Sequence, residues 1–207
     1  MEIVFQLIVL IFSVVIHEVS HGFIAEKLGD PTARLAGRLT LNPIKHLDVF
    51  GSVILPLLLW VSGTGIIFGW AKPVPYNPHN LKNPDKDGAL VAAAGPLSNF
   101  SIALVFSLFL RLVMGMGSFQ FRNLADLFAQ IVLLNIVLAI FNLVPIPPLD
   151  GSKVLFAFLP ESARKIRFFL EQYGMFIVFA FIFFGFKIIL PIIWWVFQVL
   201  TGIGVGD

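Results

Sequence analysis

Residues 3–21 have the sequence IVFQLIVLIFSVVIHEVSH, in which a long apolar run leads into a cluster of ionisable residues. Residues 3–16 are almost entirely apolar, which predicts a membrane helix. The next five residues have the pattern H-E-x-x-H, in which His17 and His21 share one helix face and can reach the same metal ion. Glu18 is set off from this pair and can instead contact a water molecule on the metal. Because ionisable side chains are costly inside a bilayer, this group predicts a functional site.

The composition is that of a membrane protein. The 207 residues are 58% hydrophobic and only 13% charged, with a mean hydropathy of +0.93, whereas soluble domains carry about a quarter charged residues. We therefore expect an all-α polytopic protein of the cell membrane with about 4–6 transmembrane segments. Residues 1–207 are expected to form a single membrane-embedded domain. The net charge of +2, with no dense basic cluster, excludes a nucleic-acid partner.

Long apolar runs predict where the membrane helices lie. Three helices are expected over about 3–28, 88–113 and 124–143. The C-terminal region, about 168–204, is also apolar and is either one long tilted helix or two segments. The polar linker 153–167 before it is expected to contain a short helix.

Other stretches are too short or too irregular for a simple span. Residues 49–70 are apolar but broken by glycines, so they form either one irregular crossing helix or a re-entrant hairpin, and we favour the hairpin. Prolines at 73–78 and 145–148 predict short extended segments. The apolar alternation over 34–41 is compatible with a short strand.

Lysine and arginine residues are biased toward one side of the predicted topology. With the N-terminus outside and 49–70 as a hairpin, 11 of the 14 basic residues fall in inside loops. They are Lys27, Arg34, Arg38, Lys45, Lys72, Lys82, Lys86, Lys153, Arg164, Lys165 and Arg167. Because cytoplasmic loops carry such an excess, the H-E-x-x-H turn and Asp150 are expected toward the cytoplasmic side. If residues 49–70 crossed the membrane instead, all later loops would lie on the opposite side and the bias of basic residues would be weaker.

A catalytic zinc site usually has three protein ligands, so the two histidines of the motif need a third. The chain has no cysteine, which leaves His46, His79 and the carboxylates. Asp150 is the best candidate, because it follows a membrane helix in a proline-constrained segment at matching depth. The alternative is that Asp150 caps the helix starting near Gly151. We expect His46 and His79 to have structural roles in loops.

Three segments of the chain are similar to the signature segments of one family. They are His17-Glu18-x-x-His21, Gly95-Pro96-x-x-Asn99 and NLVPIPPLDG from Asn142 to Gly151. Together they resemble the site-2 proteases, which are intramembrane zinc metalloproteases, over about residues 5–160. Residues 70–75 also resemble a subgroup of short prokaryotic members. These 207 residues show no counterpart of the PDZ or CBS domains of larger members, so regulation and substrate recruitment stay open.

The resemblance implies a catalytic core over about 3–160 that holds one Zn²⁺ per chain. Its implied site consists of the zinc ligands His17, His21 and Asp150, the general base Glu18, and Asn142, which holds the substrate or the oxyanion. The implied reaction is hydrolysis of peptide bonds in or near transmembrane segments of membrane proteins. The partners are therefore a transmembrane protein or peptide substrate and the lipid bilayer. An unwound substrate could pair as an added strand with the extended segments.

Two other interpretations use the same residues. A non-enzymatic membrane protein that binds or transports a metal is expected to show internal repeats and charged positions along a membrane path, and the sequence shows neither. A different class of membrane zinc protease would use Glu161 or Glu171 as its third ligand, but neither has the proline-rich setting of Asp150. Asn99 is either a residue of the site or a hydrogen-bonding residue at a helix contact.

Overall fold

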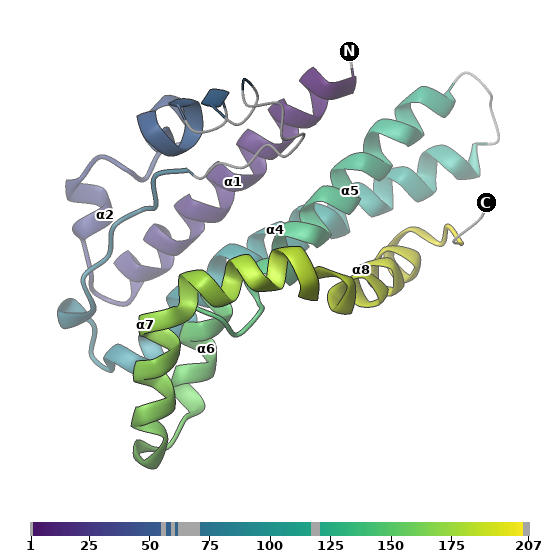
Figure 1. The fold of residues 1–207 in the computed structure, drawn as a ribbon. Coiled ribbons are helices and arrows are strands. Elements are labelled where there is room, and N and C mark those ends of the chain that lie inside the picture. Colours follow the sequence, from purple (N-terminus) through teal and green to yellow (C-terminus); the bar gives the residue numbers. More distant parts are fainter. Residues whose placement is uncertain (1, 55–56, 59–60, 62–70, 117–120, 205–207) are drawn as a thin grey trace.

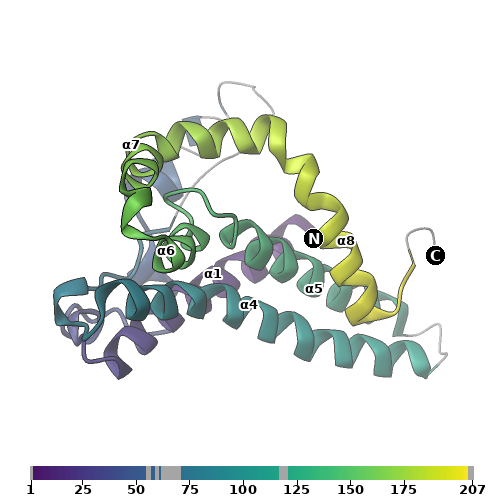
Figure 2. The same ribbon diagram turned by 90° about the horizontal axis from the view of Figure 1, so that it is seen from below.

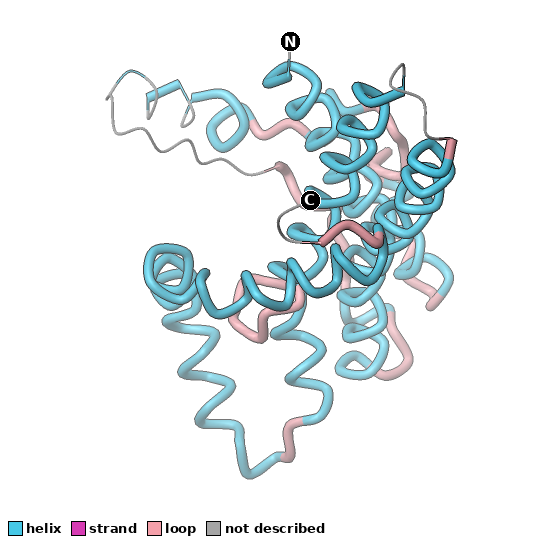
Figure 3. The backbone as a smooth tube through the Cα atoms, turned by 90° about the vertical axis from the view of Figure 1, so that its right-hand side faces the viewer, coloured by secondary structure: helices cyan, strands magenta, loops and turns pink. Residues whose placement is uncertain are grey.

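The computed structural model describes residues 2–54, 57, 58, 61, 71–116 and 121–204 (Figure 1). Every regular element among these residues is a helix, which confirms the all-α prediction (Figure 3). Within this described part, four helical stretches are long and apolar enough to cross a membrane. They are Ile3–Lys27, Pro84–Gly115, Arg122–Asn142 and Glu161–Thr201.

The first three of these stretches correspond to single helices. They are α1 (Glu2–Lys27), α4 (Pro84–Gly115) and α5 (Arg122–Asn142). After α5 come α6 (Asp150–Phe158), α7 (Arg164–Ala180), the π-helical turn η6 (Phe181–Gly185) and α8 (Phe186–Thr201). The short elements are α2 (Thr32–Leu35), the π-helix η2 (Val49–Ile54) and the 3-10 helices η1 (Pro43–His46), η3 (Pro78–Asn80) and η5 (Glu161–Ala163).

Helix α4 is the central helix of the bundle. It packs against α1, α5, α6 and α8, so helices from both ends of the chain meet on it. An apolar cluster joins Ala103 of α4 to Val132 and Ile136 of α5 and to Ile189 and Ile193 of α8. Helix α1 meets the N-terminal half of α4 at Val91 and Gly95, where small residues allow close contact. Helix α6 also packs against α4 and lies along this same half (Figure 2). This half of α4 therefore brings α1 and α6 together.

The ends of the long helices alternate between two sides of the molecule. The N-terminus, the end of α4 and the start of α5 lie toward one side, whereas the end of α1, the start of α4 and the α6–α7 connection lie toward the other (Figures 1 and 2). This arrangement agrees with the predicted up-and-down order of the spans.

The predicted positions of α1 and α5 agree with the structure to within two residues. Helix α4 begins four residues before the predicted start at about residue 88, because the helix starts at Pro84. Proline is favoured at the first helical position, and Asp85 and Asp87 in the first turn interact well with the positive end of the helix dipole. These local signals outweigh the high polarity of the stretch.

The strand considered at residues 34–41 is wrong. Helix α2 covers Thr32–Leu35, and the residues after it are irregular. Leu35 and Leu41 are 82% and 58% exposed, so the apolar alternation does not mark a buried face. A period of two predicts a strand only where a neighbouring strand is present to pair with it.

The C-terminal region, Glu161–Thr201, is one continuous helical stretch in which α7, η6 and α8 follow one another without a loop. It bends at η6 and forms an arch (Figure 2). The segment 144–149 is a series of bends and turns and not the straight extended segment that was predicted, whereas 71–77 is extended as expected. The predicted hairpin over 49–70 lies mainly outside the described residues.

A buried aspartate just after α1 ties the extended segment to that helix. Asp30 is fully buried, and its Oδ1 accepts hydrogen bonds from Thr32 and from Asn80 Nδ2, the latter at 2.7 Å. Its Oδ2 accepts the N–H of Asn77 at 2.6 Å. This one carboxylate therefore holds residues 71–80 beside the end of α1.

Replacing Asp30 by alanine is expected to lower the free energy of unfolding by about 2–4 kcal/mol, because several buried donors lose their acceptor. Burial alone would raise the pKa of Asp30, but the hydrogen bonds from Thr32, Asn80 and backbone N–H groups outweigh it and hold that pKa below its ordinary value of 3.8. The stabilisation is therefore complete above pH 3.8 and is lost as the pH falls toward the lowered folded-state pKa. Unfolding in detergent over a pH series measures both effects. The exposed Asp126→Ala is the control, and an equal loss in it would contradict the prediction.

Candidate metal centre

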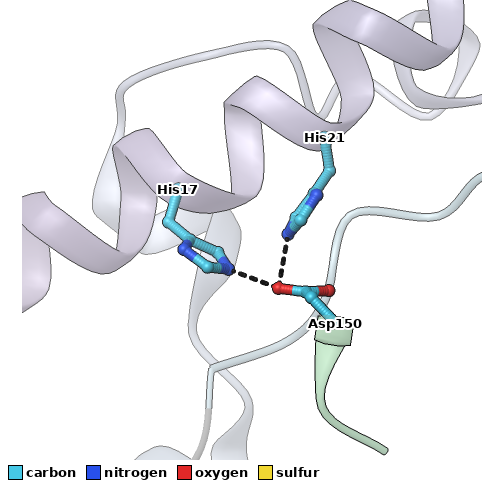
Figure 4. A group of neighbouring side chains, drawn as sticks. All are labelled: His17, His21 and Asp150. Atoms are coloured by element: carbon cyan, nitrogen blue, oxygen red, sulfur yellow. Dashed lines mark hydrogen bonds and ion pairs between the residues drawn. The ribbon is translucent and has the colours of Figure 1, made fainter. Parts of the chain in front are cut away.

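Three side chains far apart in the sequence meet between α1 and the start of α6. Asp150 Oδ2 lies 3.0 Å from His17 Nε2 and 3.3 Å from His21 Nε2, and all three side chains point to one place (Figure 4). One ligand atom from each residue lies within 4.8 Å of the others. In a tetrahedral zinc site the ligand atoms are about 3.3 Å apart, so these donors fit a zinc ion with little movement.

The far nitrogen of each imidazole is held by a hydrogen bond. His21 Nδ1 lies 2.7 Å from the carbonyl oxygen of Val91, and His17 Nδ1 lies 2.6 Å from Asn99 Oδ1. A carbonyl oxygen only accepts, so Nδ1 carries the proton and Nε2 keeps a lone pair for the metal. Since Val91 and Asn99 are both on α4, this central helix orients both histidines of α1.

Asp150 is placed by close packing at the start of α6. Leu149 is the residue that precedes the helix, and no side chain makes a capping hydrogen bond there. The carboxylate of Asp150 instead faces the two imidazoles, which argues against the capping alternative. A side chain at Gly151 would overlap the carbonyl of Leu143, so the bare glycine lets α6 begin directly beside the end of α5.

A glycine of α4 faces the metal group. A Cβ atom added to Gly95 would lie 2.5 Å from His17 Nε2 and closer still to His21 Nε2. Any side chain at this position would therefore occupy the place that the imidazoles need. In the sequence Gly95 appeared only as part of a signature segment, because its approach to α1 depends on the crossing of two helices.

Glu18 lies beside the metal group without joining it. Its Oε2 accepts a hydrogen bond of 2.8 Å from the backbone N–H of Val74, in the extended segment 71–77. Val74 stands between Pro73 and Pro75, so it carries the one backbone N–H of this tripeptide. This bond occupies one carboxylate oxygen of Glu18, and the other oxygen, Oε1, can take up a proton.

The remaining candidates have different positions. Asn142 is half-buried, and its Nδ2 donates to the carbonyl of Leu138 in its own helix at 2.9 Å. His46 is buried with Nε2 near the carbonyl of Thr40, and His79 lies in the short helix η3. Both histidines lie in short 3-10 helices of the connecting segments, not in open loops as expected, and neither is in the metal-binding group found among the described residues.

Asn99 contacts the site and also joins helices. Besides its contact with His17, its Nδ2 donates to Asn135 Oδ1 at 2.9 Å and lies 3.3 Å from the carbonyl of Ser13. Both alternatives considered for Asn99 are therefore correct. The connection of Asn135 to His17 through Asn99 follows only from the packing of α5 against α4.

Comparison with known proteins gives the family. The model of peptidase family M50 matches residues 5–125 and 112–185. Three relatives carry names of the form "putative zinc metalloprotease". YwhC of Bacillus subtilis is 44% identical over 183 residues, covering 86% of this chain and 80% of the relative. Rip2 of Mycolicibacterium smegmatis is 31% identical over 173 residues, covering 81% of this chain and 62% of the relative. MJ0611 of Methanocaldococcus jannaschii is 37% identical over 78 residues, which are 35% of each chain.

No solved structure matches this chain significantly. The family match spans most of the chain, and the relative YwhC is covered over four fifths of its length. The chain therefore belongs to peptidase family M50, the family of the site-2 proteases. Its metal is zinc, which agrees with the ligand types and spacings of the trio.

Proposed function

We propose that this protein is an intramembrane zinc endopeptidase that hydrolyses peptide bonds in or near transmembrane segments of membrane proteins. His17, His21 and Asp150 hold the zinc ion, and Glu18 is the general base. The observation that carries this proposal is the convergence of the three ligand atoms, with Glu18 beside them, among helices that can cross a membrane. A protein that only binds or carries the metal has no use for Glu18 at this place.

The chemistry follows from the positions of the protein groups. Bound zinc polarises a peptide carbonyl and lowers the pKa of water toward about 7. Glu18 takes the proton of the attacking water and returns it to the leaving amine. The Val74 N–H holds Oε2 of Glu18 and thereby orients the carboxylate, so the other oxygen handles the proton.

The proposed role of Asn142 requires a movement. A neutral amide can donate a hydrogen bond to the developing oxyanion without placing another charge in the membrane. In this structure its Nδ2 donates to the carbonyl of Leu138. Asn142 must therefore turn away from Leu138 when substrate binds.

The substrate and the orientation are also part of the proposal. A substrate helix must unwind locally, and the extended segment 71–77 is available to pair with it as an added strand. This segment is held at Glu18 and at Asp30, so a paired substrate would pass close to the general base. The excess of basic residues supports a cell-membrane topology with the site toward the cytoplasm. Crosslinking of a trapped substrate backbone elsewhere would contradict the pairing.

The decisive experiment measures zinc content and cleavage on the purified protein in lipid nanodiscs, with a panel of single-pass membrane proteins as substrates. We expect one zinc per chain and cleavage within or beside the membrane segment. A chelator should stop cleavage, and added zinc should restore it. Full activity of the zinc-free protein would overturn the proposal, as would zinc-loaded protein that cleaves none of the panel.

Asp150→Ala is expected to weaken zinc binding by at least about 100-fold and to abolish cleavage, because one of three ligands is removed. Equilibrium competition with a chelator of known affinity measures the loss. The matched control is Asp126→Ala, which removes an exposed aspartate from α5 and should keep both properties. Full zinc occupancy of Asp150→Ala would exclude it as the third ligand.

A further inference from the structure

Asn135 is a fully buried amide in the middle of α5, one of the helices that can cross a membrane. The proposed reaction does not use it. A polar side chain in such surroundings is costly unless its donor and acceptor are both satisfied. Asn135 meets this condition with two bonds. Its Nδ2 donates to the carbonyl of Ile131 at 2.9 Å, and its Oδ1 accepts from Asn99 Nδ2 at 2.9 Å.

The carbonyl of Ile131 determines which group donates and which accepts in the hydrogen bonds from Asn135 to Asn99 and from Asn99 to His17. Because a carbonyl cannot donate, Asn135 must present its NH₂ group there and its oxygen to Asn99. Asn99 must then present its NH₂ group to Asn135 and its own oxygen to His17 Nδ1, 2.6 Å away. The bond at Nδ1 of His17 therefore has to come from an N–H of the ring.

The same direction is required by a weaker, independent contact. Asn99 Nδ2 also lies 3.3 Å from the carbonyl of Ser13, which again can only accept. His21 also carries its proton on Nδ1, because its Nδ1 faces the backbone carbonyl of Val91 at 2.7 Å. A backbone carbonyl therefore fixes the position of the ring proton in His21. In His17 the side-chain amides of Asn99 and Asn135 fix it together, and we call these two amides the relay.

We propose that Asn135 is a positioning residue for the metal centre. Acting through Asn99, it keeps the proton of His17 on Nδ1 and leaves Nε2 free to bind zinc. This inference rests on the proposed role of His17 as a ligand. Without the acceptor of Asn135, only the longer contact with the Ser13 carbonyl, 3.3 Å, holds the orientation of the Asn99 amide, so the amide can turn over more readily and present its NH₂ group to Nδ1. The proton of His17 then belongs on Nε2, where it blocks coordination.

The test is the zinc affinity of Asn135→Leu, measured by chelator competition in nanodiscs without any substrate. Leucine has the same branched arrangement of four side-chain heavy atoms as asparagine, although its methyl groups are bulkier, and it offers no acceptor. We expect zinc binding about tenfold weaker than in wild type, and a changed visible absorption spectrum of the Co²⁺-loaded protein. Thermal unfolding of the metal-free protein checks the fold separately. If Asn135→Leu does not fold, Asn135→Ala removes the same acceptor.

Two control variants separate the relay from a general loss of buried polarity. Asn135→Asp keeps an acceptor oxygen toward Asn99 in either protonation state, so its zinc affinity should stay within about threefold of wild type. Ser107→Ala removes another buried side-chain donor of the helix bundle, which bonds to the carbonyl of Leu104 in its own helix and to no other group among the described residues. It should not change zinc affinity. An unchanged affinity in Asn135→Leu, or an equal loss in Ser107→Ala, would overturn the proposal.

A double-mutant cycle tests whether the effect passes through Asn99. In an Asn99→Ala background the relay is already broken, so Asn135→Leu should cause no further loss of zinc affinity. Additive losses would show that Asn135 acts by another route and would overturn the relay. Since no substrate is present, the result does not depend on proteolysis. A protein without peptidase activity could still show the relay, and an active peptidase could lack it.

Discussion

Replacing Glu18 by glutamine is expected to lower the rate of peptide hydrolysis by about 10²–10⁴-fold while zinc stays bound at one ion per chain. Glutamine has the same shape, and its Oε1 can still accept the N–H of Val74, so the local geometry is kept. What is lost is the group that takes up a proton. Single-turnover cleavage in nanodiscs, together with metal analysis of the same samples, measures the two quantities.

The control for this variant is Glu26→Gln, the same substitution two turns further along α1. Glu26 pairs with Arg34 and is not part of the metal-binding group, so this variant should keep wild-type activity. Equal activity of Glu18→Gln and wild type would remove Glu18 from the mechanism. Loss of zinc together with activity would instead show that Glu18 supports the metal.

Gly95→Ala is expected to abolish zinc binding although it adds only one methyl group. The new Cβ would lie 2.5 Å from His17 Nε2, well inside contact distance, and α4 can retreat only by breaking its packing against α1. We expect zinc binding to weaken by more than about 100-fold and the metal-free protein to lose about 1–3 kcal/mol of stability through overpacking. Chelator competition and detergent unfolding measure these effects.

Helix α4 contains a matched control for this substitution. A Cβ atom at Gly115 would have no neighbour within 4 Å. Gly115→Ala should therefore bind zinc normally and be as stable as wild type or slightly more stable. If Gly95→Ala also bound zinc normally, α1 and α4 could not be as close at the metal centre as they are in this structure.

Much of the fold could be predicted because membrane helices depend mainly on local composition. Long apolar runs are sufficient for α1 and α5, since a spanning segment must satisfy its backbone hydrogen bonds internally. The early start of α4 at Pro84 was missed because polar residues were given more weight than helix-start signals. The strand expected at 34–41 was wrong because strand formation depends on a partner that the local pattern cannot supply.

The metal group was predictable for a related reason. His17 and His21 are one helical turn apart, so their spacing alone brings them together. Asp150 was selected by its setting and by the family resemblance, and the structure brings it within 3.3 Å of both histidines. The groups that support this trio could not be predicted in the same way.

Local sequence was sufficient for the spans, the paired histidines and the position of Glu18 beside them, because helix formation and spacing along a helix involve only near neighbours. The contacts of Gly95 with the imidazoles, of Val74 with Glu18 and of Asn135 with Asn99 depend on the assembled bundle. Each of them joins residues at least 36 positions apart. The contacts of Gly95 and Asn135 arise only when α4 crosses α1 and α5 at one particular place, which is a property of packing among the three helices. The contact of Val74 arises only when the segment 71–77 lies against α1.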